Sequence, residues 1–290
     1  MNDHLKGLLF TTLGVLFVVP DSLFVRLIVA DPLVVAFWRG MTSGLIILAG
    51  LLVVQGTKGF GEVLRCGWPG VIYMFLIGST APGFVLAITQ TSVANVVFIF
   101  ASMPVFSAIF SRVFLGEPIR LRMVLTMAVV MVGLGIIAYG SEESEIASWK
   151  GDAWALYVTI AYSGALTAVR KVKEISMIPA IPIAYIGSAL VFWPFIAPVE
   201  AFPGQWELFV GHGAFIAIAT CFLTLGPRFI SSAEVSLLIL LESVLAPILV
   251  WVVIGEDPGE WALIGGAVVI GALFVSNLVV LMRKKPTRQA

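Results

Sequence analysis

Three ionisable residues lie inside long apolar stretches of the sequence, where charged side chains are rare. They are Asp21, Arg39 and Glu242. Because an ion is costly inside a hydrocarbon layer, such residues usually mark the path of a polar molecule or pair with one another. Asp21 and Arg39 fall at similar depth in neighbouring stretches, so they could form a purely structural ion pair. Alternatively, the planar fork of Arg39 could hold the carboxylate of a ligand, with Asp21 beside it.

Glu242 differs from these two residues because no basic residue is obvious at its depth. Its carboxyl group could be protonated, hydrogen-bonded to a neighbouring helix, or open to a polar cavity. A carboxyl group in such a place can take up and release protons. We therefore predict that Glu242 binds a ligand and is the candidate for proton coupling, with packing as the alternative role.

Further polar and aromatic side chains in the apolar stretches could hydrogen-bond or stack on a small ligand, although each could equally serve packing. The candidates are Tyr73, Ser79, Asn95, Phe98, Ser102, Tyr157, Tyr162 and Tyr185. Prolines can free backbone carbonyls where a helix lines a cavity, and those placed to do so are Pro20, Pro82 and Pro104. Glycines predicted to let helices pack closely are Gly133, Gly135, Gly265, Gly266 and Gly271.

The elements that must position these residues are membrane-spanning helices. Hydrophobic residues make up 60% of the chain, charged residues 12%, and the mean hydropathy is +1.06. A transmembrane helix needs about 20 mostly apolar residues. Ten stretches qualify, and we read the first as a retained helix rather than a signal peptide. They are 5–29, 33–54, 68–89, 92–114, 119–139, 151–170, 178–199, 208–227, 232–254 and 258–282.

The distribution of basic residues predicts the orientation of these helices. With the N-terminus inside, 14 of the 17 Lys and Arg residues fall on the cytoplasmic side, only Arg26 and Lys150 fall outside, and Arg39 lies within a span. By the positive-inside rule, both termini are therefore expected in the cytoplasm of a cell whose inner membrane holds this multi-pass chain. The acidic run 141–148 is then an external connector.

An internal repeat divides the chain into two halves of five helices each. At a constant offset of 139 residues, Gly116-Glu117 matches Gly255-Glu256, and 128–130 matches 267–269. An odd number of helices per repeat inverts the second half in the membrane, an architecture typical of secondary transporters. We predict a first repeat at 1–140, an external linker at 141–150, a second repeat at 151–282 and a basic cytoplasmic tail at 283–290.

The chain resembles the EamA-type transporters of the drug/metabolite transporter superfamily over nearly its whole length. The resemblance rests on the pattern Ala94, Pro104, Gly116-Glu117 and on its echo Ala233, 241–242 and 255–256, each followed by a glycine-rich helix. It implies a ten-helix transporter that typically exports amino acids or similar metabolites. Where the second repeat usually reads Leu-Glu-Pro, this chain has Leu-Glu-Ser at 241–243, which leaves the height of any kink in that helix open.

Motifs of other functional classes are absent from the sequence. It contains no GxxxxGK[ST], HExxH or GxSxG pattern, and we place His4 and His212 in the N-terminal tail and an outer loop. We therefore expect no enzyme activity, no cofactor and no bound metal. The balance of 17 basic and 17 acidic residues, without a basic cluster interleaved with exposed aromatic residues, gives no reason to expect nucleic acid as a partner.

These observations together predict a secondary transporter that functions as a monomer in the lipid bilayer. The expected substrate is a small polar metabolite, most simply an amino acid or a related zwitterion or amine, exported with protons as a possible partner. An uncoupled facilitator of the same metabolites is the nearest alternative. A polytopic membrane enzyme or a scaffold is the alternative from another class.

Overall fold

The computed structural model describes residues 3–90, 96, 99–100, 102–140, 149–255 and 259–283, and every regular element within them is a helix. We call residues 3–140 the first half and 149–283 the second half. The first half contains α1 (Asp3–Val18), α2 (Asp21–Leu27), α3 (Pro32–Val54), α4 (Lys58–Arg65), α5 (Trp68–Gln90), α7 (Met103–Leu115) and α8 (Leu121–Gly140). The second half contains α9 (Trp149–Lys171), α10 (Ala180–Phe192), α11 (Pro198–Ala201), α12 (Trp206–Leu225), α13 (Ser232–Ile239), α14 (Glu242–Ile254) and α15 (Gly259–Arg283), with short 3-10 turns at Trp193–Phe195 and Gly226–Arg228.

Five helical runs in the described chain are long and apolar enough to cross a membrane. They are Asp3–Leu27, Pro32–Val54, Trp68–Ala87, Trp206–Arg228 and Ser232–Ile254. Four shorter apolar helices accompany them, at Met103–Leu115, Leu121–Ile136, Ala180–Phe195 and Leu263–Ser276. Large apolar side chains such as Phe75 and Phe274 are 70% and 66% exposed, as lipid-facing surfaces require. The all-helical class is confirmed, whereas the count of ten spans stays a prediction.

Two helices predicted as continuous are broken in the middle. The predicted helix 5–29 ends as α1 at Val18 and resumes as α2 at Asp21, because Pro20 lacks the N–H that would continue the ladder. The predicted helix 232–254 is interrupted by a turn between α13 and α14. This second break lies immediately before Glu242 and needs no proline, so the Leu-Glu-Ser departure does not remove it.

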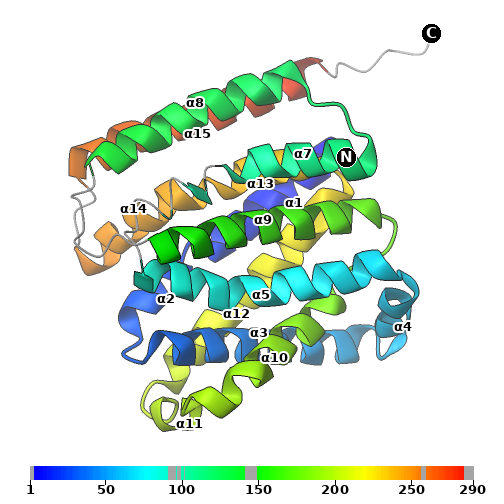
Figure 1. Cartoon of the computed structure of the whole chain (residues 1–290), viewed down its shortest axis with the longest axis vertical. Helices are drawn as coiled ribbons and strands as arrows, with labels where there is room; N and C mark the ends of the chain where they lie inside the picture. The colour runs from blue at the N-terminus through cyan, green and yellow to red at the C-terminus, as the bar shows by residue number, and fades with distance from the viewer. Residues whose placement is uncertain are drawn as a thin grey trace.

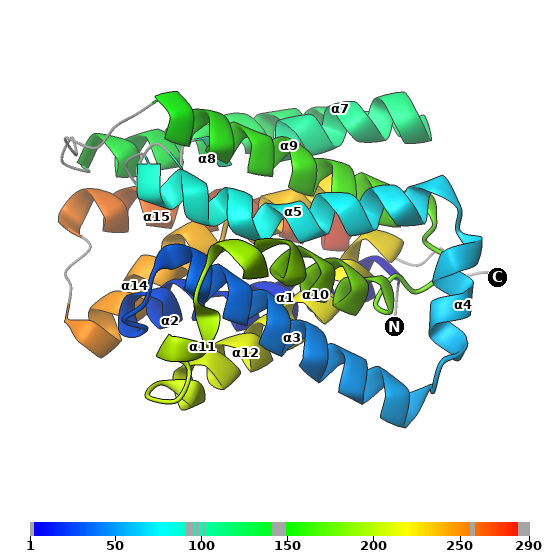
Figure 2. The same ribbon diagram turned by 60° about the horizontal axis from the view of Figure 1, so that its bottom comes forward.

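The two halves pack on each other in exchanged pairs. Helix α5 packs on α9 as α12 packs on α1, and α3 packs on α12 as α10 packs on α5. Likewise α7 packs on α9 as α14, its counterpart at the offset of 139 residues, packs on α1 together with α13. Two further pairs join helices at corresponding positions, namely α3 with α10 and α8 with α15, and α7 also packs on α13. The start of α1 and the end of α15 lie at the same end of the bundle, opposite the end of α8 and the start of α9 (Figures 1 and 2).

Close helix packing uses some of the predicted glycines but not all. A Cβ at Gly133 of α8 would lie 2.9 Å from the carbonyl oxygen of Gly265 in α15, and one at Gly266 would lie 2.6 Å from Val244. These contacts confirm the packing role of Gly133 and Gly266. The prediction was wrong for Gly135 and Gly271, because nothing lies within 4 Å of the position that a Cβ would take there.

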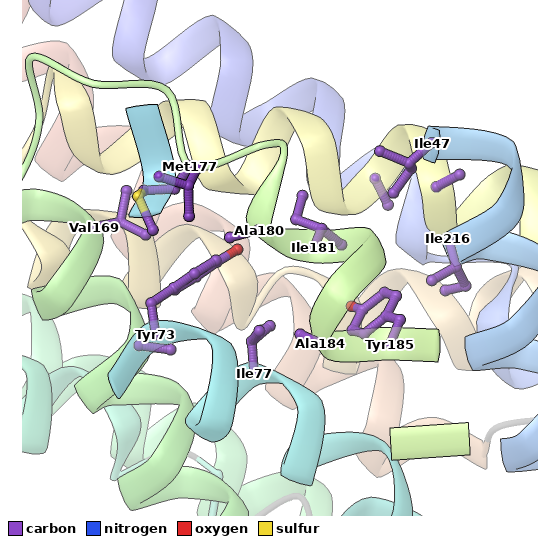
Figure 3. Packing of buried hydrophobic residues seen from close by; sticks show 14 of the residues in the cluster. Ile47, Tyr73, Ile77, Val169, Met177, Ala180, Ile181, Ala184, Tyr185 and Ile216 are labelled. Carbon is purple, nitrogen blue, oxygen red and sulfur yellow. The ribbon is translucent and has the colours of Figure 1, made fainter. Parts of the chain in front are cut away.

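The largest buried hydrophobic cluster among the described residues contains side chains from both halves. Helices α3 and α5 of the first half contribute Ile47, Tyr73 and Ile77, and the second half contributes Met177, Ile181 and Tyr185 among others (Figure 3). The two tyrosine hydroxyls are satisfied inside the cluster, since Tyr73 Oη lies 2.9 Å from Thr224 Oγ1 and Tyr185 Oη lies 3.0 Å from Thr220 Oγ1. The cluster thus fixes α5 and α10 against α12 without leaving a buried hydroxyl unpaired.

Candidate functional site

A cavity of about 210 Å³, which we call the central cavity, lies where the broken helices meet. Asp21 at the start of α2, Met103 at the start of α7 and Glu242 at the start of α14 all line it. Each of these residues stands at the amino end of a helix segment, where backbone N–H groups lack partners in their own helix. Discontinuous helices whose ends face a cavity are the usual way in which membrane proteins place polar groups at depth.

Asp21 and Arg39 form an ion pair at the edge of this cavity, as the sequence suggested. Arg39 Nη2 donates to Asp21 Oδ2 over 2.7 Å, and Arg39 Nε donates to Asp21 Oδ1 over 3.1 Å. The two side chains are 17% and 7% exposed, so the pair is largely shielded from solvent. This geometry is the bidentate fork that an arginine, but not a lysine, can present to a carboxylate.

His212 completes a triad with this pair, and the prediction that it lies in an outer loop was wrong. Helix α12 begins at Trp206 and carries His212 inward, where its ring is fully buried and its Nε2 lies 2.5 Å from Asp21 Oδ1. The ring also stacks on Phe24 of α2, with centroids 5.3 Å apart. Nδ1 is buried and has no hydrogen-bond partner among the described residues, so the polar contact of the ring is made through Nε2.

The close approach of α12 to α3 explains why His212 reaches Asp21. At Gly213, next to His212, a Cβ would collide with the side chain of Thr42 in α3. Thr42 Oγ1 itself bonds to the carbonyl oxygens of Trp38 and Phe209, and so bridges the two helices. No local sequence motif predicts this contact. The one signal in the sequence is a histidine next to a glycine within an apolar helical stretch, which is consistent with a buried histidine at a close helix contact.

Glu242 lines the same cavity and has a different environment. Its carboxylate makes no hydrogen bond or ion pair with any residue that the structure describes. The expectation that no basic residue shares its depth was wrong, because Arg39 lines the same cavity. However, the Arg39 fork is directed at Asp21, so Glu242 keeps its lone pairs for another partner.

The remaining predicted residues divide into three groups. Tyr162 and Tyr185 line the central cavity. Four others make contacts away from its lining: Tyr73 bonds to Thr224, Tyr157 donates to Ser79 Oγ over 2.7 Å, and Ser102 bonds to the carbonyl oxygen of Ile99. Asn95 and Phe98 lie outside the described residues. Lining residues that the sequence reasoning missed include Thr80, Phe84, Phe100, Thr220 and Ser243.

A second polar region, which we call the terminal cavity, lies beside the start of α1 and encloses about 430 Å³. Two ion pairs there join the halves, with 2.6 Å between Arg122 Nη2 and Glu234 Oε1 and 2.8 Å between Arg170 Nε and Glu117 Oε1. His4 was wrongly placed in a tail, since it belongs to α1, is 7% exposed and lies 3.4 Å from Glu234. The sequence reading passed over Glu234 because it stands near the end of its apolar stretch.

Comparisons with known proteins agree with this architecture. The EamA-like transporter family matches the chain twice, at residues 5–139 and 149–278. The "Uncharacterized transporter YdfC" of Bacillus subtilis (strain 168) is 24% identical in an alignment over 192 residues, and the alignment covers 61% of this chain and 60% of the length of that protein. A solved structure described as "Crystal structure of protein" has a TM-score of 0.80 at 18% identity and covers 96% of this chain and 99% of that chain, a likeness of fold.

Proposed function

Because the chain belongs to the EamA-like transporter family, we propose that it is a secondary transporter that moves a small polar metabolite by alternating access between two inverted halves. The coarser part of this statement, a multi-pass membrane protein of a small-molecule transporter family, follows from the two family matches and the apolar helices. Membership in a transporter family also favours transport over catalysis.

The observation that carries the proposal is the place of the central cavity. It lies between residues of both halves, at helix breaks in α1–α2 and α13–α14, and Arg39, Asp21 and Glu242 all line it. A site at a repeat interface can be exposed to one side and then the other when one half rocks against the other. The exchanged packing pairs support such a symmetric motion.

The finer parts of the proposal are those predicted from the sequence. The halves are five-helix repeats at 1–140 and 151–282, related by inversion, with both termini cytoplasmic, ten spans in all, and a monomer in the inner membrane as the working unit. The proposed substrate is an amino acid or a related zwitterion or amine, moved outward. Arg39 would then face a carboxylate through the donors that Asp21 leaves free, and Glu242 would face an ammonium group.

Counterflow in liposomes tests transport directly. Vesicles that contain only this protein, preloaded with unlabelled substrate, should accumulate the labelled compound transiently, and the compound should be recovered unchanged. An uncoupled facilitator gives the same counterflow but ignores an imposed pH gradient. A membrane enzyme would instead return a chemically altered compound, and a scaffold would show no flux; either result would contradict the proposal.

A further inference from the structure

The charges around the central cavity are not equally available to a ligand. Asp21 accepts hydrogen bonds from Arg39 at both carboxylate oxygens and lies 2.5 Å from His212 Nε2. Arg39 in turn donates hydrogen bonds from Nε and Nη2 to Asp21. Because these partners already neutralise one another, the triad offers a ligand little net charge.

Glu242 is the lining carboxylate whose oxygens are bound by none of the described residues. It is the first residue of α14, a helix of 13 residues, and the amino end of a helix favours a negative charge. An ionised carboxylate in a small, largely apolar cavity needs a cationic partner or hydrogen-bond donors from its occupant. The cavity therefore presents to whatever enters it one acidic group that no described side chain hydrogen-bonds.

An aromatic wall faces the same space. Phe84 of α5 and Phe100 both line the cavity, and their rings stack with centroids 5.9 Å apart. Tyr162 of α9 adds a third ring to the lining. Aromatic faces attract ammonium groups, most strongly where water is excluded, and they also pack well against an apolar body.

From this combination we propose that the group recognised in the central cavity is an organic ammonium, held by Glu242 and packed against the Phe84–Phe100 wall, and that a substrate carboxylate is not required. The inference rests on the proposed transport function and narrows its substrate class from zwitterions and amines to amines. The ring or alkyl body of the amine occupies the apolar part of the lining, which includes Val158 and Leu240.

Three compounds with one shared body separate the possibilities: 2-phenylethylamine, phenylalanine and 3-phenylpropionate carry an amine, both groups, or a carboxylate alone. Purified protein is tested for thermal stabilisation and in liposomes for counterflow with each compound. A ligand that binds only the folded state raises apparent stability by mass action. We expect the amine to stabilise the protein and to support counterflow, with weaker effects of phenylalanine and none of the carboxylate.

Variants assign the effect to the two parts of the site. Glu242→Gln should weaken amine binding roughly ten- to hundredfold, because a charge-assisted hydrogen bond is lost. Phe100→Leu keeps an apolar side chain without the ring and should weaken amine binding roughly two- to thirtyfold. Glu207→Gln, at an exposed position in the first turn of α12, is the matched control and should leave binding unchanged.

Each outcome bears on one proposal or the other. If the amine fails to stabilise the folded protein, if the carboxylate binds more tightly than the amine, or if folded Glu242→Gln keeps full amine affinity, the amine inference is overturned. Counterflow of phenylalanine without any response to the amine would retain transport and reject the amine site. Amine binding that depends on Glu242 without counterflow of any compound would retain the site and reject transport.

Discussion

At the scale of single residues, the site separates a charge-balanced scaffold from a free carboxylate. Asp21, Arg39 and His212 satisfy one another in a largely buried triad, whereas Glu242 opens into the cavity. Removing one member of a buried pair leaves an uncompensated charge, which is far more costly than losing an exposed ion pair. Substitutions in the triad should therefore affect folding and transport together, whereas substitutions at Glu242 should act on transport alone.

Arg39→Lys should impair transport, because the point charge of a lysine cannot reproduce the bidentate fork directed at Asp21. Arg39→Ala should do worse and should lower the unfolding free energy by about 3–5 kcal/mol, since Asp21 keeps a buried charge. Counterflow and thermal unfolding in detergent measure the two effects. If both variants fold and transport normally, neither a substrate role for Arg39 nor a required pair with Asp21 survives.

His212→Leu should lower the unfolding free energy by about 1–3 kcal/mol, because Asp21 loses one of its buried partners. His212→Gln retains an N–H donor and should recover part of this loss, which a general packing role would not predict. Thermal unfolding of the two variants and the wild type gives the comparison. Equal stability of the leucine and glutamine variants would show that the contact with Asp21 contributes nothing measurable.

If Glu242 carries the coupling proton, as the sequence predicts, Glu242→Gln should abolish accumulation driven by a pH gradient. Passive exchange should persist at substrate concentrations raised enough to offset the weaker binding of the variant. Glutamine keeps the shape and a hydrogen-bonding group but does not titrate. Uptake into liposomes with and without a gradient separates the two activities. Full gradient-driven uptake by the variant would remove Glu242 as the coupling group, and indifference of the wild type to the gradient would indicate a uniporter.

At the scale of helices, interruptions and close contacts build the site. Pro20 and the turn before Glu242 stop α1 and α13 where their next residues can face the cavity. Left-handed glycines, Gly116 at φ 69° and Gly255 at φ 83°, end α7 and α14 at positions related by the repeat. Both need the conformational freedom of glycine, so the same stop signal is used in each half.

Gly213→Ala should destabilise the contact between α12 and α3, because the added Cβ would collide with Thr42. We expect a loss of about 1–3 kcal/mol, as for other overpacked interiors. Gly187→Ala in α10 is the matched control, since nothing lies within 4 Å of its Cβ position, and it should be neutral or slightly stabilising through helix propensity. Thermal unfolding of the two variants measures the difference in stability, and equal unfolding midpoints would contradict the close contact between α12 and α3 at Gly213.

At the scale of the whole molecule, the halves are joined through exchanged helix pairs and through ion pairs at the terminal cavity. Arg122 with Glu234 and Arg170 with Glu117 each link one half to the other, beside the start of α1. In the proposed inverted arrangement this end of α1 is cytoplasmic. The charged residues that predicted the orientation then also hold the two halves together on that side.

The proposed topology can be tested by labelling single introduced cysteines in intact cells, after replacement of Cys66 and Cys221. A cysteine at Glu207, or at Glu143 in the linker outside the described residues, should react with an impermeant reagent added outside. A cysteine at Lys58 or Lys173 should not react until the membrane is opened. External labelling at Lys173 would overturn the inverted arrangement, because it would put on the outside a loop of the second half that this arrangement puts in the cytoplasm.

Much of the architecture is written in the sequence, because it depends on local patterns. Apolar runs interrupted by glycine and proline specify helices, and the recurrence at an offset of 139 residues specifies two related halves. Asp21, Arg39 and Glu242 could be singled out because an ionisable residue in an apolar run is conspicuous at any position. Their joint presence around one cavity agrees with that reasoning.

The tertiary structure alone decided which of these groups remain free to bind a ligand. His212 and Asp21 are 191 residues apart, and their contact depends on the close approach of α12 to α3 at Gly213. The break before Glu242 contains no proline, so local sequence rules do not predict it. Hydrophobic periodicity constrains one helix at a time, whereas partner choice among buried charges is set by how several helices pack, and this information is not local.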